Sequence, residues 1–128
     1  MVWPNPALAQ QNNALAQNAV SYCAQQTGVS PASTAVGDTR TMMGRFWLEG
    51  RVGTGQLDPR IVQNSKRDDV RNDMARLDGC LAPLAEAAGT GGFYRAGVQA
   101  YDAARDLAIR ADRNPALVPH LQRMGLMQ

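Results

Sequence analysis

The sequence predicts an all-α protein, an irregular bundle of four main helices plus a short C-terminal helix. Three observations predict this fold. Apolar residues recur at helical spacing along most of the chain, and Asn-Pro or Asp-Pro pairs and glycines stand where helices would begin and end. Runs of the β-branched and aromatic residues that favour strands are missing. The chain has 128 residues, enough for one domain, so we expect residues 1–128 to form a single helical domain.

The first expected helix begins at Asn5-Pro6 and ends near Thr27. Asn caps the free N–H groups of a helix start, Pro fits the first helical position, and Gly28 suits the left-handed C-cap. Gln and Asn cover the polar face without one charge, which makes that face a candidate docking surface. The apolar stripe of this helix is expected to hold Leu8, Leu15, Ala19, Tyr22 and Cys23.

The second expected helix begins at a cap formed by Asp38, after a loop over residues 28–37, and ends near Gly50. It carries a cluster of large residues on one side. Methionine and aromatic residues are enriched at the cores of protein interfaces, so this cluster and the N-terminal Trp are the candidate partner contacts. The alternative is that the cluster packs into the core, because the chain has few other large residues. The candidate contacts are Trp3, Met42, Met43, Phe46 and Trp47.

The middle of the chain predicts a helix start at Asp58-Pro59, and a second one at Ser65 with Asp68 as its capping-box partner. The clearest apolar stripe of the chain comes next, with alternating spacings of four and three residues. Pro83 falls inside it and is expected to kink or break the helix. The stripe consists of Val70, Met74, Leu77, Leu81, Leu84 and Ala88.

A further helix is expected over residues 93–112, and a short terminal helix after it. Residues 114–117 repeat the Asn-Pro-Ala-Leu of the N-terminus, and Pro119 limits the length of the terminal helix. The small residues of the long helix allow close helix packing, and Tyr94, Val98 and Tyr101 widen its buried side. Its main apolar face is expected to hold Phe93, Gly97, Ala100, Ala104, Leu107 and Ala111.

Charge and hydropathy argue against two classes of partner. The net charge is +2, residues 1–37 carry no charged side chain, and positive charges are interleaved with negative ones beyond them. Nucleic-acid binders concentrate basic residues on one face, so we expect no nucleic-acid partner. No run of apolar residues approaches the roughly 18 that a membrane span needs. The few residues before Ala7 are also too short for a signal peptide, unless one was removed and Met1 replaced it.

Catalytic, metal and cofactor motifs are not found in the sequence. The only histidine, His120, has no partner at motif spacing, and the glycine-rich segments lack the strand and Lys of a phosphate loop. We therefore expect a non-catalytic protein without metal or cofactor. The two cysteines, Cys23 and Cys80, form either a disulfide or two buried thiols. A disulfide would favour a periplasmic or secreted protein.

These observations favour a small helical accessory or structural subunit that binds a larger protein. An uncharged helix face suits docking because few charges lose their water. Two alternatives remain. One is a structural component of a repeating assembly such as a phage particle or filament, and the other is a small enzyme or ligand carrier with a site built from scattered residues.

Overall fold

The computed structural model describes residues 6–49 and 57–128, and the side chains of residues 14–45 and 57–128. This part of the chain is helical and without strands, so the predicted all-α bundle of four main helices and a short C-terminal helix is confirmed. One more short helix, α3, precedes α4. The elements are α1 (Pro6–Thr27), α2 (Thr34–Glu49), α3 (Pro59–Asn64), α4 (Asp68–Ala87), α5 (Gly91–Arg113), the 3-10 turn η2 (Pro115–Leu117) and α6 (Val118–Arg123).

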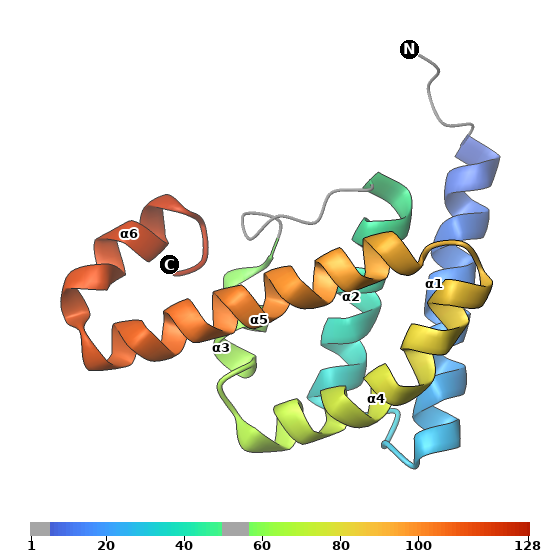
Figure 1. Ribbon diagram of the computed structural model, residues 1–128, viewed down its shortest axis with the longest axis horizontal. Helices are drawn as coiled ribbons and strands as arrows, with labels where there is room; N and C mark the ends of the chain where they lie inside the picture. Colours follow the sequence, from blue (N-terminus) through green and yellow to red (C-terminus); the bar gives the residue numbers. More distant parts are fainter. Residues whose placement is uncertain (1–5, 50–56) are drawn as a thin grey trace.

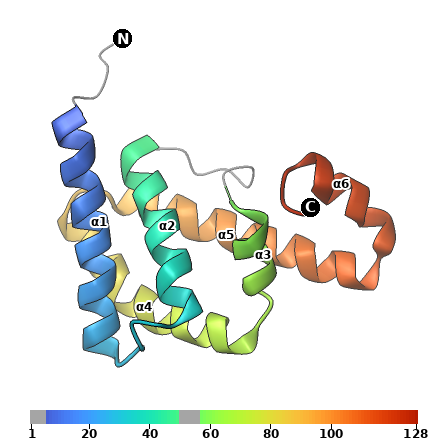
Figure 2. The same cartoon turned by 180° about the vertical axis from the view of Figure 1, so that it is seen from behind.

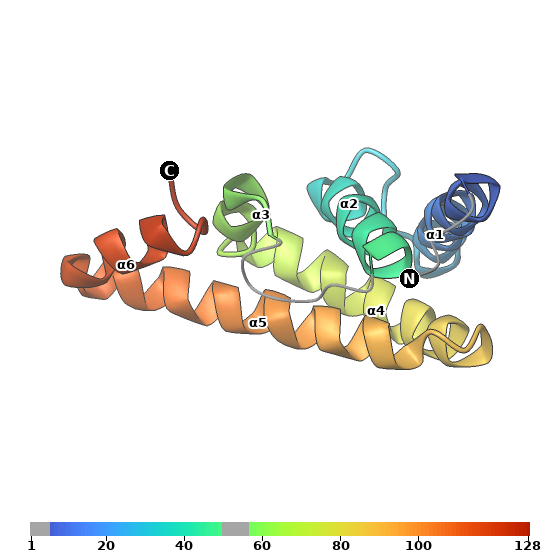
Figure 3. The same cartoon turned by 90° about the horizontal axis from the view of Figure 1, so that it is seen from above.

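The helices form two layers. Helices α4 and α5 make one layer and diverge from the turn that joins them, so that they enclose a V (Figure 1). Seen from behind, α1 and α2 lie side by side across this layer, and both pack against α4 (Figure 2). The C-terminal part of α5 extends beyond α4, and η2 and α6 fold back along it (Figure 3). This arrangement places α4 between α1 on one side and α5 on the other.

The ends of α1 and α3 agree with the sequence signals. α1 begins at Pro6 and ends at Thr27, and Gly28 has the positive φ of +73° that a left-handed cap requires. α3 begins at Pro59, where the Asp58 Oδ1 accepts the Arg60 N–H at 2.7 Å. Both Pro-containing helix starts were therefore predicted from their local sequence.

The start predicted at Asp38 is wrong. α2 already begins at Thr34, because the Ser33 Oγ accepts the Ala35 N–H at 3.2 Å and caps the helix. Both Ala35 and Val36 are buried, so the first turn packs into the core instead of forming a loop. Asp38 lies within the helix and accepts a hydrogen bond from the Asn64 amide at 3.1 Å.

The start predicted at Ser65 is also wrong. Its buried hydroxyl donates to the Val62 carbonyl at 2.5 Å, which uses Ser65 to end α3. α4 begins at Asp68 and continues through Pro83 to Ala87, so the proline does not break it. Pro83 and Gly79 are both exposed, and the Gly79 carbonyl that loses its partner can face water.

The inner face of α1 differs from the predicted stripe. Small residues face the core, while Leu15 and Tyr22 are exposed, so the prediction is wrong for those two. Small side chains allow α1 to approach α2 and α4 closely, and the Gln17 amide donates to the Arg40 carbonyl of α2 at 3.2 Å. Leu8 lies outside the described side chains, and the buried residues among the described ones of α1 are Ala16, Val20, Cys23 and Ala24.

The stripes of α4 and α5 lie in the core only in part. On α4, Leu77 and Leu81 are buried, but near its C-terminal end Ala85 is buried where Leu84 was predicted. On α5, Phe93 is exposed, so its predicted burial is wrong, whereas the predicted burial of the adjacent Tyr94 is confirmed. A helix has 3.6 residues per turn, so a seven-residue pattern gradually rotates away from the core.

None of the helices in the described residues combines the length and apolar character of a membrane span.

Candidate functional site

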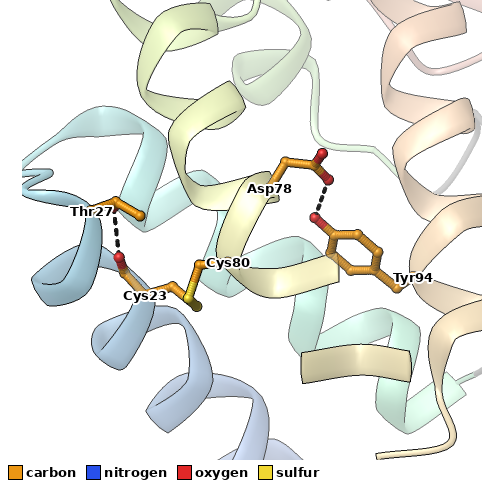
Figure 4. Close-up of a disulfide and its surroundings, with 5 residues drawn as sticks. All are labelled: Cys23, Thr27, Asp78, Cys80 and Tyr94. Carbon is orange, nitrogen blue, oxygen red and sulfur yellow. Dashed lines mark hydrogen bonds between the residues drawn. A yellow bond between two sulfur atoms is a disulfide. The ribbon is translucent and has the colours of Figure 1, made fainter. Parts of the chain in front are cut away.

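A disulfide joins α1 to α4. Cys23 and Cys80 are bonded with their Cα atoms 5.6 Å apart, which settles the two sequence alternatives for these residues. Cys23 is buried, and the Thr27 hydroxyl donates to its carbonyl at 2.6 Å (Figure 4). The bond therefore fixes the separation of the two helices that border one of the hollows in the described part of the structure.

This first hollow, the outer groove, lies on the outer side of α1 and α4. Its volume is about 440 Å³. Leu15 and Tyr22 stand on the α1 side, with 58% and 51% of their surfaces exposed, and Leu84 stands opposite on α4 with 37% exposed. The lining residues are Leu15, Asn18, Ala19, Tyr22, Leu84, Ala88 and Thr90.

The outer groove has a distinctive composition. Three of the four large apolar side chains that are exposed in the described residues line it, and Phe93 is the fourth. No charged side chain is among the described residues that line it. Exposed apolar side chains that gather in one place mark binding surfaces more often than scattered ones do.

The second hollow, the inner cavity, lies in the V between α4 and α5, with α2 behind it. Its volume is about 250 Å³. Its apolar wall comes from all three helices, and charged residues occur only among its more exposed lining residues. The lining residues are Thr39, Met42, Met43, Arg71, Met74, Ala75, Leu77, Asp78, Leu81, Tyr94, Gly97, Val98, Tyr101, Asp102 and Arg105.

A hydrogen bond spans the V between α4 and α5. The Tyr94 hydroxyl donates to the Asp78 Oδ1 at 2.5 Å, and Asp78 leaves α4 on a different side from Cys80 (Figure 4). Burial, together with this bond to a carboxylate, raises the pKa of Tyr94 well above its usual value. Near the same cavity, burial also raises the pKa of Asp102, and the neighbouring Asp106 adds to the effect.

Tyr101 lies further along α5 and also keeps its proton. Burial first, and then the carboxylate of Asp38, raise the pKa of Tyr101 to about 12. The Ser65 hydroxyl is close by but donates to the Val62 carbonyl. The Tyr101 hydroxyl is therefore buried without a hydrogen bond of normal geometry to a described residue.

The predicted partner contacts divide into two groups. Met42 and Met43 are buried and line the inner cavity, which agrees with the core alternative for these two residues. Trp3 and the side chains of Phe46 and Trp47 lie outside the described part of the structure. Contact of this set with a partner stays a prediction.

Sequence reasoning missed the outer groove. It placed Leu15, Tyr22 and Leu84 in the core because their spacing is helical. The sequence of α1 did contain evidence for this groove. Leu15 and Tyr22, seven residues apart, lie on one side of the helix, and Ala16, Val20 and Cys23 lie on another. Two apolar lines on one helix indicate two contact faces.

The described residues contain no group of three or more His, Cys, Asp or Glu side chains that could hold a metal ion. His120 is exposed on α6, away from both hollows. The chain matches no protein-family model, no curated protein and no solved structure.

Proposed function

We propose that this protein is a non-catalytic helical accessory subunit that binds a larger protein through the outer groove. One observation carries the proposal, namely that three of the four large apolar side chains exposed in the described residues line this groove, and that no described lining residue is charged. Burying apolar surface is favourable because of the hydrophobic effect. Because the groove is uncharged, binding does not require that an ion be removed from water.

The geometry favours a helix as the bound element. A hollow between two helices accepts an amphipathic helix, whose apolar residues enter it at intervals of three, four and seven positions. Leu15 and Tyr22 lie two helical turns apart, about 10 Å along α1, so a bound helix would contact both with residues of two successive turns. The contacting face of the partner would be apolar and uncharged, like the groove.

We also propose that the protein works in an oxidising compartment, as a periplasmic or secreted protein. The support is the Cys23–Cys80 disulfide, since such bonds persist in oxidising compartments and are rare in the cytosol.

Site-specific photocrosslinking in the source organism tests the docking proposal. The full chain is expressed with p-benzoylphenylalanine at Tyr22, and a matched variant carries the same residue at Gln99, which is exposed on α5 outside both hollows. We expect one adduct of constant mass at position 22 and none at position 99. Adding Leu84→Glu should abolish the adduct, because it places a charge in the groove.

Two results would contradict the proposal. Equal adducts at positions 22 and 99 would show that the contact is not specific to the groove. An adduct with the mass of two copies of this chain would support the alternative of a repeating assembly.

A further inference from the structure

We propose that the inner cavity binds a small, uncharged apolar molecule about the size of two fused rings. This inference is independent of the docking surface, because the inner cavity and the outer groove share no residue. It rests on the size of the cavity, the chemistry of its wall and the balance of charge around its opening.

The size of the cavity suits a small organic molecule. The cavity is open to solvent on one side and has a volume of about 250 Å³. A dry apolar cavity of about 150 Å³ in another protein accepts benzene. The greater volume here accommodates a molecule with one more ring.

The wall is apolar and adaptable. Met42, Met43 and Met74 line the cavity together with Leu77 and Leu81. Methionine side chains are flexible and polarizable, so they adjust to the shape of a bound ring and contact it favourably.

Two of the three hydroxyl groups among the described lining residues already have partners. The Thr39 hydroxyl donates to the Met74 sulfur at 3.0 Å, and the Tyr94 hydroxyl donates to Asp78 at 2.5 Å. The third, the Tyr101 hydroxyl, is buried without a hydrogen bond to a described residue, so a ligand needs at most one polar group. Apolar contact is the main interaction that this wall offers.

The charges around the opening favour a neutral ligand. Two arginines and two aspartates line the cavity, so neither sign predominates. Arg105 is held by its Nε, which donates to the Ser65 carbonyl at 2.9 Å, and Asp78 is engaged by Tyr94. A charged ligand would lose water without gaining one dominant counter-charge.

Methyl NMR of the oxidised full chain tests the inference. The methionine methyl groups are labelled with carbon-13 and indole, a neutral two-ring probe, is added. The signals of Met42, Met43 and Met74 should move together with one dissociation constant, on the order of 1 mM or below. Those of Met124 and Met127, which lie beyond α5 and outside the cavity, should stay in place.

Two charged relatives of the probe test the class of ligand. Indole-3-acetate is an anion and tryptamine is a cation, and both contain the same ring system. We expect each to bind about tenfold more weakly than indole, because a charge near the cavity must give up part of its water. Tighter binding of either one would overturn the assignment to neutral molecules.

A matched pair of variants locates the binding. Ala75 and Ala103 are both exposed helical alanines, but only Ala75 lines the cavity. Ala75→Phe should weaken indole binding about fivefold or more by obstructing the cavity, whereas Ala103→Phe should leave it unchanged. Circular dichroism of both variants confirms that they are folded.

The inference is overturned by any of three results. The first is that the Met42, Met43 and Met74 signals do not move with indole up to about 10 mM, as would happen if a side chain outside the described ones fills the cavity. The second is that Met124 and Met127 move equally. The third is that the Ala75 and Ala103 variants bind alike.

Discussion

Helix α4 separates two hollows that differ in how they present apolar surface. Leu84 and Ala88, near its C-terminal end, line the outer groove, whereas Leu77 and Leu81 line the inner cavity. In the outer groove the large apolar side chains are exposed, and none of the described lining residues is charged. In the inner cavity most of them are buried, and the charged lining residues Arg71, Asp78, Asp102 and Arg105 are partly or fully exposed.

The difference indicates what each hollow can bind. Exposed and projecting apolar groups offer a broad contact that a protein helix can cover. A more deeply buried apolar wall with charged residues among its lining suits a small molecule better than a helix. The total apolar content does not separate the two proposed functions. The exposure of the side chains and the position of the charged residues separate them.

Removing the disulfide should have the largest effect on stability. Cys23 and Cys80 are 57 residues apart, and closing a loop of that length in the unfolded chain is worth about 4 kcal/mol. The double variant Cys23→Ala/Cys80→Ala should therefore unfold in urea with a free energy lower by about this amount. Reduction of the unmodified protein should give a similar loss, and a loss below about 1 kcal/mol would contradict the prediction.

The same variant distinguishes the two hollows. The bond links α1, which lines only the outer groove, to α4, and it does not join any two of the helices α2, α4 and α5 that enclose the inner cavity. In conditions where the variant remains folded, crosslinking at Tyr22 should fall while indole binding is kept.

Two leucines of α4 provide the second prediction. Leu77 is 1% exposed and Leu84 is 37% exposed. Leu77→Ala should lower the free energy of unfolding by about 3 kcal/mol, because it enlarges a void in the core. Leu84→Ala should lower it by less than about 1 kcal/mol, since much of that side chain is already in water. Urea denaturation of both variants measures the contrast, and similar losses would show that the outer groove is part of the core.

The fold was predictable because its signals are local. Pro6 and Gly28 bound α1, and Asp58-Pro59 begins α3, each through contacts within a few residues. Asp38 failed as a cap because Ser33 competed for the same role, and two turn-forming residues in one segment look alike without the structure. The prediction for Ser65 failed for a different reason. Its hydroxyl caps the end of one helix instead of the start of the next.

The two hollows were not predictable in the same way. Helical spacing shows that Leu15 and Tyr22 share a face, but only packing decides whether that face or the alanine face meets the core. Met42 and Met43 are adjacent in sequence and still line one cavity, because α4 and α5 diverge where α2 crosses them. The angle between two helices depends on long-range packing.

Alkaline pH provides the third and smallest prediction, and it concerns the inner region alone. Burial raises the pKa of Tyr101 to about 12. In the unfolded chain a tyrosine ionises near pH 10, so between about pH 10 and 12 the folded state retains a proton that the unfolded state loses. The contribution of the raised Tyr101 pKa to the free energy of unfolding is fully present below about pH 10. It falls as the pH rises, by about 1 kcal/mol at pH 11. Tyr101→Phe should remove this part of the decrease in the free energy of unfolding at alkaline pH.

Urea denaturation at pH 8 and pH 11 measures the effect. Tyr94 contributes in the same direction, because its pKa is also raised, so Tyr94→Phe should flatten the dependence as well. Tyr22→Phe is the control, since Tyr22 is half-exposed at the outer groove. At pH 8 the two inner variants should diverge, because Tyr94→Phe loses a hydrogen bond to Asp78 whereas Tyr101→Phe removes a buried hydroxyl that has no such bond. Tyr22→Phe could reduce the pH dependence of the free energy of unfolding as much as Tyr101→Phe does. In that case the effect would not come from burial, and it would not distinguish the inner cavity from the outer groove.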